Sequence, residues 1–174
     1  MKHQVHPTSK IYQYQLIKKV NWPAALSWFY FLIMAVAAAL FAVICGVQIA
    51  LWLAAGLPIV FLFQFLLHRF ILIVFHHTSL QKWTFRVYPP LWGVIPDQYI
   101  SIRRMVTIQL NLFFIGIVWI ACFIPWIPIQ LITVFLFLHV WTMLPGTASL
   151  FICYRAYPDG LLKFNPNDVS CYKS

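Results

Sequence analysis

Four uncharged apolar runs constrain this chain more than any other feature of its sequence. They extend from about Ala24 to Ile44, Ile49 to Leu67, Thr107 to Phe123 and Ile127 to Leu144, and none contains Lys, Arg, Asp or Glu. A helix needs ~20 mostly apolar residues to cross the ~30 Å hydrocarbon core of a bilayer. The whole chain is 63% hydrophobic and only 9% charged, which is too apolar for a water-soluble domain. We therefore expect an all-α integral membrane protein with four transmembrane helices in two tandem hairpins.

The basic residues predict the orientation of these helices. All twelve Lys and Arg residues lie in the N-terminal segment, the central loop or the tail, and none lies in the two short connections at 45–48 and 125–126. Positive residues in short loops stay on the cytoplasmic side of a membrane. We therefore expect a multi-pass protein of the cell membrane with both termini and the central loop in the cytoplasm. The predicted divisions are 1–23 (interfacial), 24–67 (first hairpin), 68–106 (cytoplasmic loop), 107–144 (second hairpin) and 145–174 (cytoplasmic tail).

The formal charge of +9 predicts that the cytoplasmic side contacts anionic lipid headgroups. Each basic residue near such a surface contributes about 1 kcal/mol. Direct nucleic-acid binding is not expected, because the neighbouring aromatic residues suit anchoring at the membrane interface. Lys10 to Val20 is expected to form a short helix that lies on the inner leaflet.

A similar unit occurs twice along the chain, once from the Tyr14 region to Ser101 and again from Tyr99 to Ser170. Each copy begins with Tyr, a hydrophobic residue and a basic pair, and each ends with aromatic-Arg-x-Tyr-Pro. Tandem repeats of this kind predict a parallel duplication of one helix pair, although chance similarity of two membrane hairpins stays open. The second hairpin is expected to be the shorter. The best-matching segments provide the candidate partner-docking residues Arg86, Tyr88, Pro89, Arg155, Tyr157 and Pro158.

Two amides inside the apolar runs, Gln64 and Asn111, are the candidate intramembrane polar contacts. An amide in hydrocarbon requires a partner, and such interhelical bonds contribute about 0.6–2 kcal/mol. These residues either connect the helices of this chain or specify an oligomer or a heteromeric partner.

No residues point to catalysis, a cofactor or a metal. The chain has no Glu and only three Asp, all in predicted turns, so no intramembrane carboxylate marks a proton or cation path. His68 and His139 are expected at the inner ends of their helices. No carboxylate or Cys lies at ligand spacing from His68, His76 and His77. We therefore predict that the chain is not an enzyme.

The basic and aromatic N-terminal segment, the tight hairpin and the Asp159-Gly160 turn together resemble the TcpE-like small membrane proteins of Gram-positive conjugative elements. The resemblance implies a structural subunit of a conjugation (type IV secretion) channel that works beside an ATPase and other membrane subunits. Members of that family usually have one hairpin, so the doubled arrangement departs from the pattern and no functional residue is transferred.

The leading hypothesis is a non-catalytic multi-pass subunit of a larger membrane complex, which docks protein partners at its cytoplasmic segments. The alternative is a small stand-alone transporter, channel or immunity-type membrane protein, or a homo-oligomer of one. That alternative predicts a water-accessible path lined by Gln64, Asn111, Gln130 and Thr133. A membrane enzyme that uses the three histidines named above is the weakest hypothesis.

Overall fold

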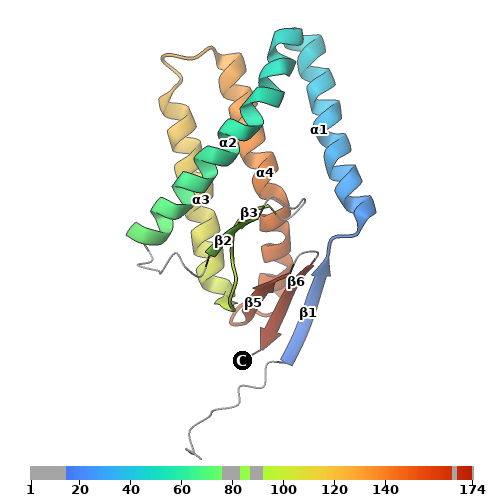
Figure 1. Cartoon of the computed structure of the whole chain (residues 1–174), viewed down its shortest axis with the longest axis vertical. Coiled ribbons are helices and arrows are strands. Elements are labelled where there is room, and N and C mark those ends of the chain that lie inside the picture. The colour runs from blue at the N-terminus through green and yellow to red at the C-terminus, as the bar shows by residue number, and fades with distance from the viewer. Residues whose placement is uncertain (1–14, 76–82, 87–91, 166–167, 174) are drawn as a thin grey trace, which may run out of the picture.

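The four apolar runs form four long helices. The computed structural model describes residues 15–75, 83–86, 92–165 and 168–173. The helices are α1 (Ala24–Cys45), α2 (Val47–Val74), α3 (Ile102–Cys122) and α4 (Ile129–Ala156), and each is long and apolar enough to cross a membrane. Successive helices alternate in direction (Figure 1). The prediction of four long apolar helices is confirmed.

The two helix pairs have nearly the same dimensions. α1 and α2 contain 22 and 28 residues, and α3 and α4 contain 21 and 28. The second pair is shorter by one residue, so the two pairs match in length more closely than expected. α4 continues past Leu144 through a stretch that contains Pro, Gly, Thr and Ser. The hydroxyls of Thr147 and Ser149 bond to carbonyls of the preceding turn, so these polar side chains are satisfied within the helix.

Strands form at one end of the bundle, and the all-α expectation is wrong in this respect. They are β1 (Gln15–Asn21), β2 (Trp83–Arg86), β3 (Gly93–Pro96), β4 (Ile100–Ser101), β5 (Leu161–Phe164) and β6 (Asp168–Lys173). β1, β6, β5 and β4 form an antiparallel four-stranded sheet in that order, and β2 pairs with β3 in a separate hairpin. The four-stranded sheet lies below the helices in Figure 1, and we call this end of the bundle the sheet end.

A short interfacial helix was expected over Lys10 to Val20; residues 15–20 instead lie in β1, and residues 10–14 lie outside the described residues. β1 pairs with β6 from Gln15 opposite Lys173 to Asn21 opposite Asp168. This pairing satisfies backbone groups that a seven-residue helix would have left open at both ends. Apolar side chains of the sheet join the part of the core at the sheet end, which also includes side chains of α3 and α4. Its members include Ile102, Leu150, Cys153, Leu162, Phe164, Val169 and Cys171.

α1 is the least buried helix, and Tyr30 is its only residue classed as buried among those described. Pro145 has no N–H, so within α4 it cannot bond to the carbonyl of Trp141. The Tyr30 hydroxyl donates to that carbonyl at 2.8 Å, and the Tyr30 ring stacks on the Trp141 ring at 4.1 Å between centroids. Tyr30 therefore attaches α1 to α4 and satisfies the acceptor that the proline leaves open.

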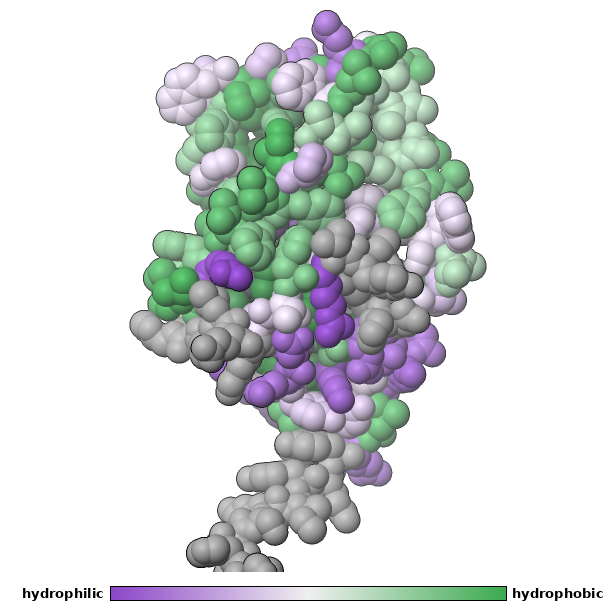
Figure 2. Space-filling model, in the orientation of Figure 1, coloured by the Kyte–Doolittle hydropathy of each residue, from purple (hydrophilic) through white to green (hydrophobic). Residues whose placement is uncertain are grey.

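Polar and apolar surfaces are separated along the long axis of the molecule. Figure 2 shows hydrophobic residues over the helices and hydrophilic residues gathered around the sheet end. The chain thus has a lipid-compatible bundle and a polar, strand-containing base.

Candidate functional site

A buried cluster of polar side chains connects α2 to α4. Gln64 Nε2 lies 3.0 Å from His139 Nδ1, 2.7 Å from Thr142 Oγ1 and 3.3 Å from the carbonyl oxygen of His139. His139 is fully buried and Thr142 nearly so. We call Gln64, His139 and Thr142 the polar cluster. The predicted candidate Gln64 thus bonds between two helices of the same chain.

The hydrogen bonds around His139 are compatible with one neutral tautomer. Nδ1 accepts from Gln64, so Nε2 carries the proton and donates to the carbonyl of Phe113 in α3 at 3.4 Å. Gly116 makes room for the ring, because a Cβ at this position would overlap the imidazole of His139. His139 lies in the first half of α4, so its expected place at the inner end of the helix is wrong.

A cavity of about 60 Å³ lies beside the polar cluster, between α2, α3, α4 and the β2–β3 hairpin. Its polar lining comes from Gln64, His68, Gln109 and Thr142, and much of the rest is aromatic. The hairpin covers it, because Trp92 Nε1 donates to the Thr142 carbonyl at 3.0 Å. This volume is large enough for a few water molecules beside several polar partners.

The residues of the hypothetical water path do not come together. Asn111 is half-buried in α3, and Gln130 and Thr133 are exposed near the start of α4. The Thr133 hydroxyl bonds to the carbonyl of Ile129 in its own helix. Of the four predicted path residues only Gln64 lines the cavity.

Sequence reasoning missed Gln109 and Trp92. Gln109 is a polar residue in an apolar run, as Gln64 is, and the same criterion would have found it. Trp92 gave no local signal, because its partner in α4 is 50 positions away.

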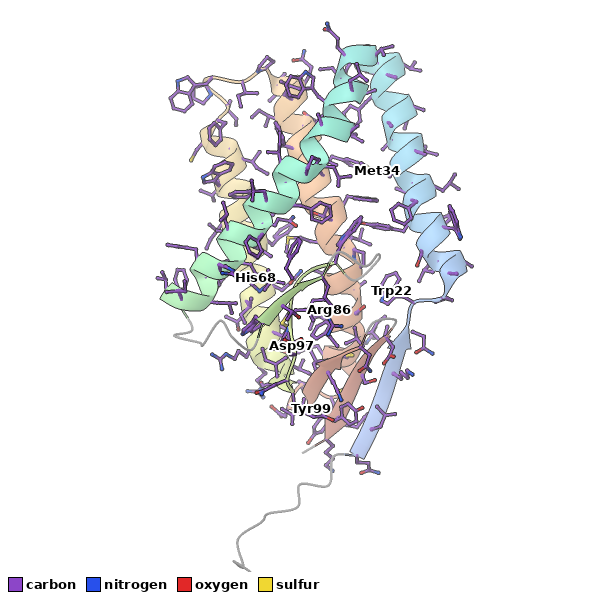
Figure 3. All side chains as sticks on the ribbon, viewed as in Figure 1. Trp22, Met34, His68, Arg86, Asp97 and Tyr99 are labelled. Atoms are coloured by element: carbon purple, nitrogen blue, oxygen red, sulfur yellow. The ribbon has the colours of Figure 1, made fainter. Side chains whose placement is uncertain are left out.

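The first docking motif lies partly on the β2–β3 hairpin. Arg86 Nη2 is 3.6 Å from Asp97 Oδ1, and the two side chains lie at the hairpin in Figure 3. Tyr88 and Pro89 lie outside the described residues, as do His76 and His77. Arg86 therefore forms an ion pair within its own hairpin.

The second docking motif has a different backbone. Arg155 is exposed in the last turn of α4, and the half-buried Tyr157 and Pro158 follow the helix end. Arg86, by contrast, lies in a strand. At Arg86 and Arg155 the two similar sequences therefore have different secondary structure.

The three carboxylates of the chain all form ion pairs at the sheet end. Besides Arg86 with Asp97, the pairs are Lys19 Nζ with Asp168 Oδ1 at 3.4 Å and Arg103 Nη2 with Asp159 Oδ1 at 2.7 Å. With twelve basic residues and three acidic ones in the sequence, these pairs leave a large positive excess.

Asp168 and Cys171 on β6 have shifted pKa values. Burial opposes ionisation of Asp168, but hydrogen bonds from Asn165 and Ser170 and the charge of Lys19 outweigh it and lower its pKa. Burial raises the pKa of the Cys171 thiol, and a hydrogen bond with Cys153 only partly offsets this effect. Within the part of the chain that the structure describes, no three His, Cys or carboxylate side chains gather as a metal site.

Comparison with known proteins gives no relative for this chain. No protein-family model, no curated protein and no solved structure matches it. Function must therefore be argued from the residues themselves.

Proposed function

We propose that this chain is a non-catalytic subunit of a larger membrane complex, placed in the cell membrane with the sheet end in the cytoplasm. The observation that carries the proposal is the four-stranded sheet at the basic end of the bundle. It joins the first described strand to the last, and it gives a chain of four apolar helices a folded base on which a partner can dock.

Charge and exposure at the base support docking. The three carboxylates are paired within the chain, so the remaining basic side chains attract an acidic partner surface or anionic lipid. β1 is an edge strand, and all its residues except Val20 are exposed. An edge strand can bind an extended segment of a partner through main-chain hydrogen bonds. Lys18 on the same strand favours an acidic segment and discourages non-specific pairing.

The partner class follows from the resemblance to the TcpE-like proteins. We propose that the complex is a conjugation or type IV secretion channel. Deletion of the gene should then abolish transfer of the mobile element without slowing growth. Normal transfer after deletion would refute the conjugation-channel proposal, but it would leave the docking proposal in place.

Site-specific photocrosslinking in cells tests the docking proposal directly. A photoreactive amino acid at Lys18 or Arg155 should crosslink to a partner protein. The matched control is Trp126, which is exposed in the α3–α4 connection at the opposite end of the bundle, and it should give no such product. Absence of crosslinks at the sheet end, together with purification as a lone monomer in mild detergent, would contradict the proposal.

The cavity beside the polar cluster favours the second candidate function, a small transporter or channel. A conducting path should include the lining residues Gln64, Gln109 and Thr142. Single cysteines at these positions, in a chain without its native cysteines, should then react with a membrane-impermeant thiol reagent. Protection at all three positions would exclude an aqueous path through the cavity, and the exposed Gln130 serves as the accessible control.

A further inference from the structure

An apolar groove runs between α3 and α4 near the sheet end. Its volume is about 350 Å³, and it is lined by Val106, Gln109, Leu110, Thr147, Leu150, Phe151 and Tyr154. We call it the α3–α4 groove. Val106 is four residues inside the start of α3, and Tyr154 is two residues from the end of α4. At 1.5 Å of rise per residue, the groove begins at the end of the helices and extends toward the middle of the bundle.

Gln109 lies between the α3–α4 groove and the cavity beside the polar cluster, and it lines both. Among the described residues, the Gln109 amide makes no hydrogen bond. Its Nε2 lies near Gly146, at 3.7 Å from where a Cβ would stand, so the amide occupies the wall between the two helices. An amide at this depth gains from a partner that can accept or donate a hydrogen bond. The ester groups of a phospholipid supply such a partner.

Arg103 and Arg155 stand about one helical turn beyond the groove-lining residues, toward the sheet end. Arg103 precedes Val106 by three positions on α3, and Arg155 follows Phe151 by four positions on α4, so each continues the groove-lining face of its helix. Both are exposed. Arg103 also pairs with Asp159, whereas Arg155 makes no ion pair among the described residues. An anionic group at this end of the groove would therefore give Arg155 an ion-pair partner.

The spacing matches the layers of a bilayer. Gln109 is six residues from Arg103 along α3, which places it about 9 Å deeper. The polar layer on each side of the hydrocarbon core is about 5–8 Å thick. Arg103 at phosphate level therefore puts the Gln109 amide at the boundary between headgroup and acyl chain.

We propose that the α3–α4 groove is a binding site for one phospholipid with an anionic headgroup. An acyl chain fills the groove, Gln109 bonds to the glycerol ester region, and Arg155 with Arg103 binds the phosphate. Apolar surface gives no driving force between groups inside a bilayer, so Gln109 and the arginines provide the selectivity. This site does not depend on protein docking at the sheet.

Native mass spectrometry of the protein from mixed micelles of phosphatidylglycerol and phosphatidylcholine tests the site. The wild-type chain should retain phosphatidylglycerol in preference to phosphatidylcholine. Arg155→Gln should weaken this retention about fivefold, and Gln109→Leu on the order of threefold. Leu110→Trp should fill the groove and abolish the preferential retention of phosphatidylglycerol.

Two matched controls should retain the lipid as the wild type does. Arg69→Gln removes an exposed basic residue on α2 that lies over the ring of Phe65, and Val118→Trp adds an indole at an exposed position farther along α3. Equal retention of both lipids, or an equal loss in Arg69→Gln and Arg155→Gln, would overturn the proposal.

A second measurement needs no variant. Phosphatidylglycerol with a photoreactive acyl chain should label wild-type peptides that contain Val106–Leu110 and Thr147–Tyr154. Labelling spread evenly over all four helices would show a general lipid annulus and no site.

Discussion

Substitution of Gly116 by Ala gives the sharpest test of the packing around the polar cluster. A Cβ on Gly116 would overlap the imidazole of His139, closer than real Cβ atoms approach any neighbour. Overpacking costs about 1–3 kcal/mol, and this overlap with a fully buried ring favours the upper value. Ala gains about 1 kcal/mol over Gly in helix propensity. Gly116→Ala should therefore lower the free energy of unfolding by about 2 kcal/mol.

Gly146→Ala is the matched control, because its nearest neighbour is Gln109 Nε2 at an ordinary 3.7 Å. This variant gains the same helix propensity without the overlap, so the two alanine variants should differ by about 3 kcal/mol. The assay is reversible unfolding in mixed micelles titrated with SDS and followed by circular dichroism.

A double-mutant cycle with His139→Ala separates the overlap from other effects. Without the imidazole ring, Gly116→Ala should no longer destabilise the protein, which gives a coupling energy of about 3 kcal/mol. If Gly116→Ala still costs about 2 kcal/mol in the His139→Ala background, the contact between Gly116 and His139 is not the cause. Equal stability of Gly116→Ala and Gly146→Ala would refute the reasoning altogether.

Three further predictions concern the backbone and the sheet. Tyr30→Phe should lower the free energy of unfolding by about 1–2 kcal/mol, since it leaves the Trp141 carbonyl without its donor. Pro145→Ala should recover part of that loss, because it restores the helical N–H. Additive effects of the two substitutions in the same unfolding assay would contradict this. The lowered pKa of Asp168 means that its contribution to stability is present above its ordinary value of 3.8 and is lost as the pH falls through the folded-state value. The protection factors of the β6 amides against hydrogen exchange should therefore fall in acid, and Asp168→Asn should remove that pH dependence. Gly46→Ala should cost about 1 kcal/mol, because Gly46 has a φ of 93°. A stability equal to that of the wild type would show that the connection can relax.

The helices could be predicted from the sequence because their signal is local. Length and lack of charge determine a membrane span one segment at a time, and the start of α1 at Ala24 is where the first apolar run begins. The ends at the sheet side were less predictable. α2 continues through Arg69 to Val74, and α3 begins before Arg103 and Arg104, because basic side chains near a helix end can extend to the interface.

The strands could not be predicted because their partners are distant. β1 contains two adjacent lysines and has no clean alternation of apolar and polar residues. Its extended form depends on β6, where Asn21 pairs with Asp168. The hydrogen bond from Trp92 to the Thr142 carbonyl was equally unpredictable, because the two residues are 50 positions apart. In the candidate site, Gln64 was found as an isolated amide, but its partners His139 and Thr142 became apparent only from the packing of α2 on α4.

The pairing of β1 with β6 sets an order for biosynthesis. Gln15 is translated early, yet Lys173, its partner, leaves the ribosome only after all four helices. At 5–20 residues per second, this delay lasts roughly ten to thirty seconds. During that time β1 has no partner strand, and α1 through α4 are synthesised without the sheet. Closure of the sheet can therefore occur only in a chain translated through β6, so a partner that recognises the sheet would bind chains that contain β6 and not chains truncated before it.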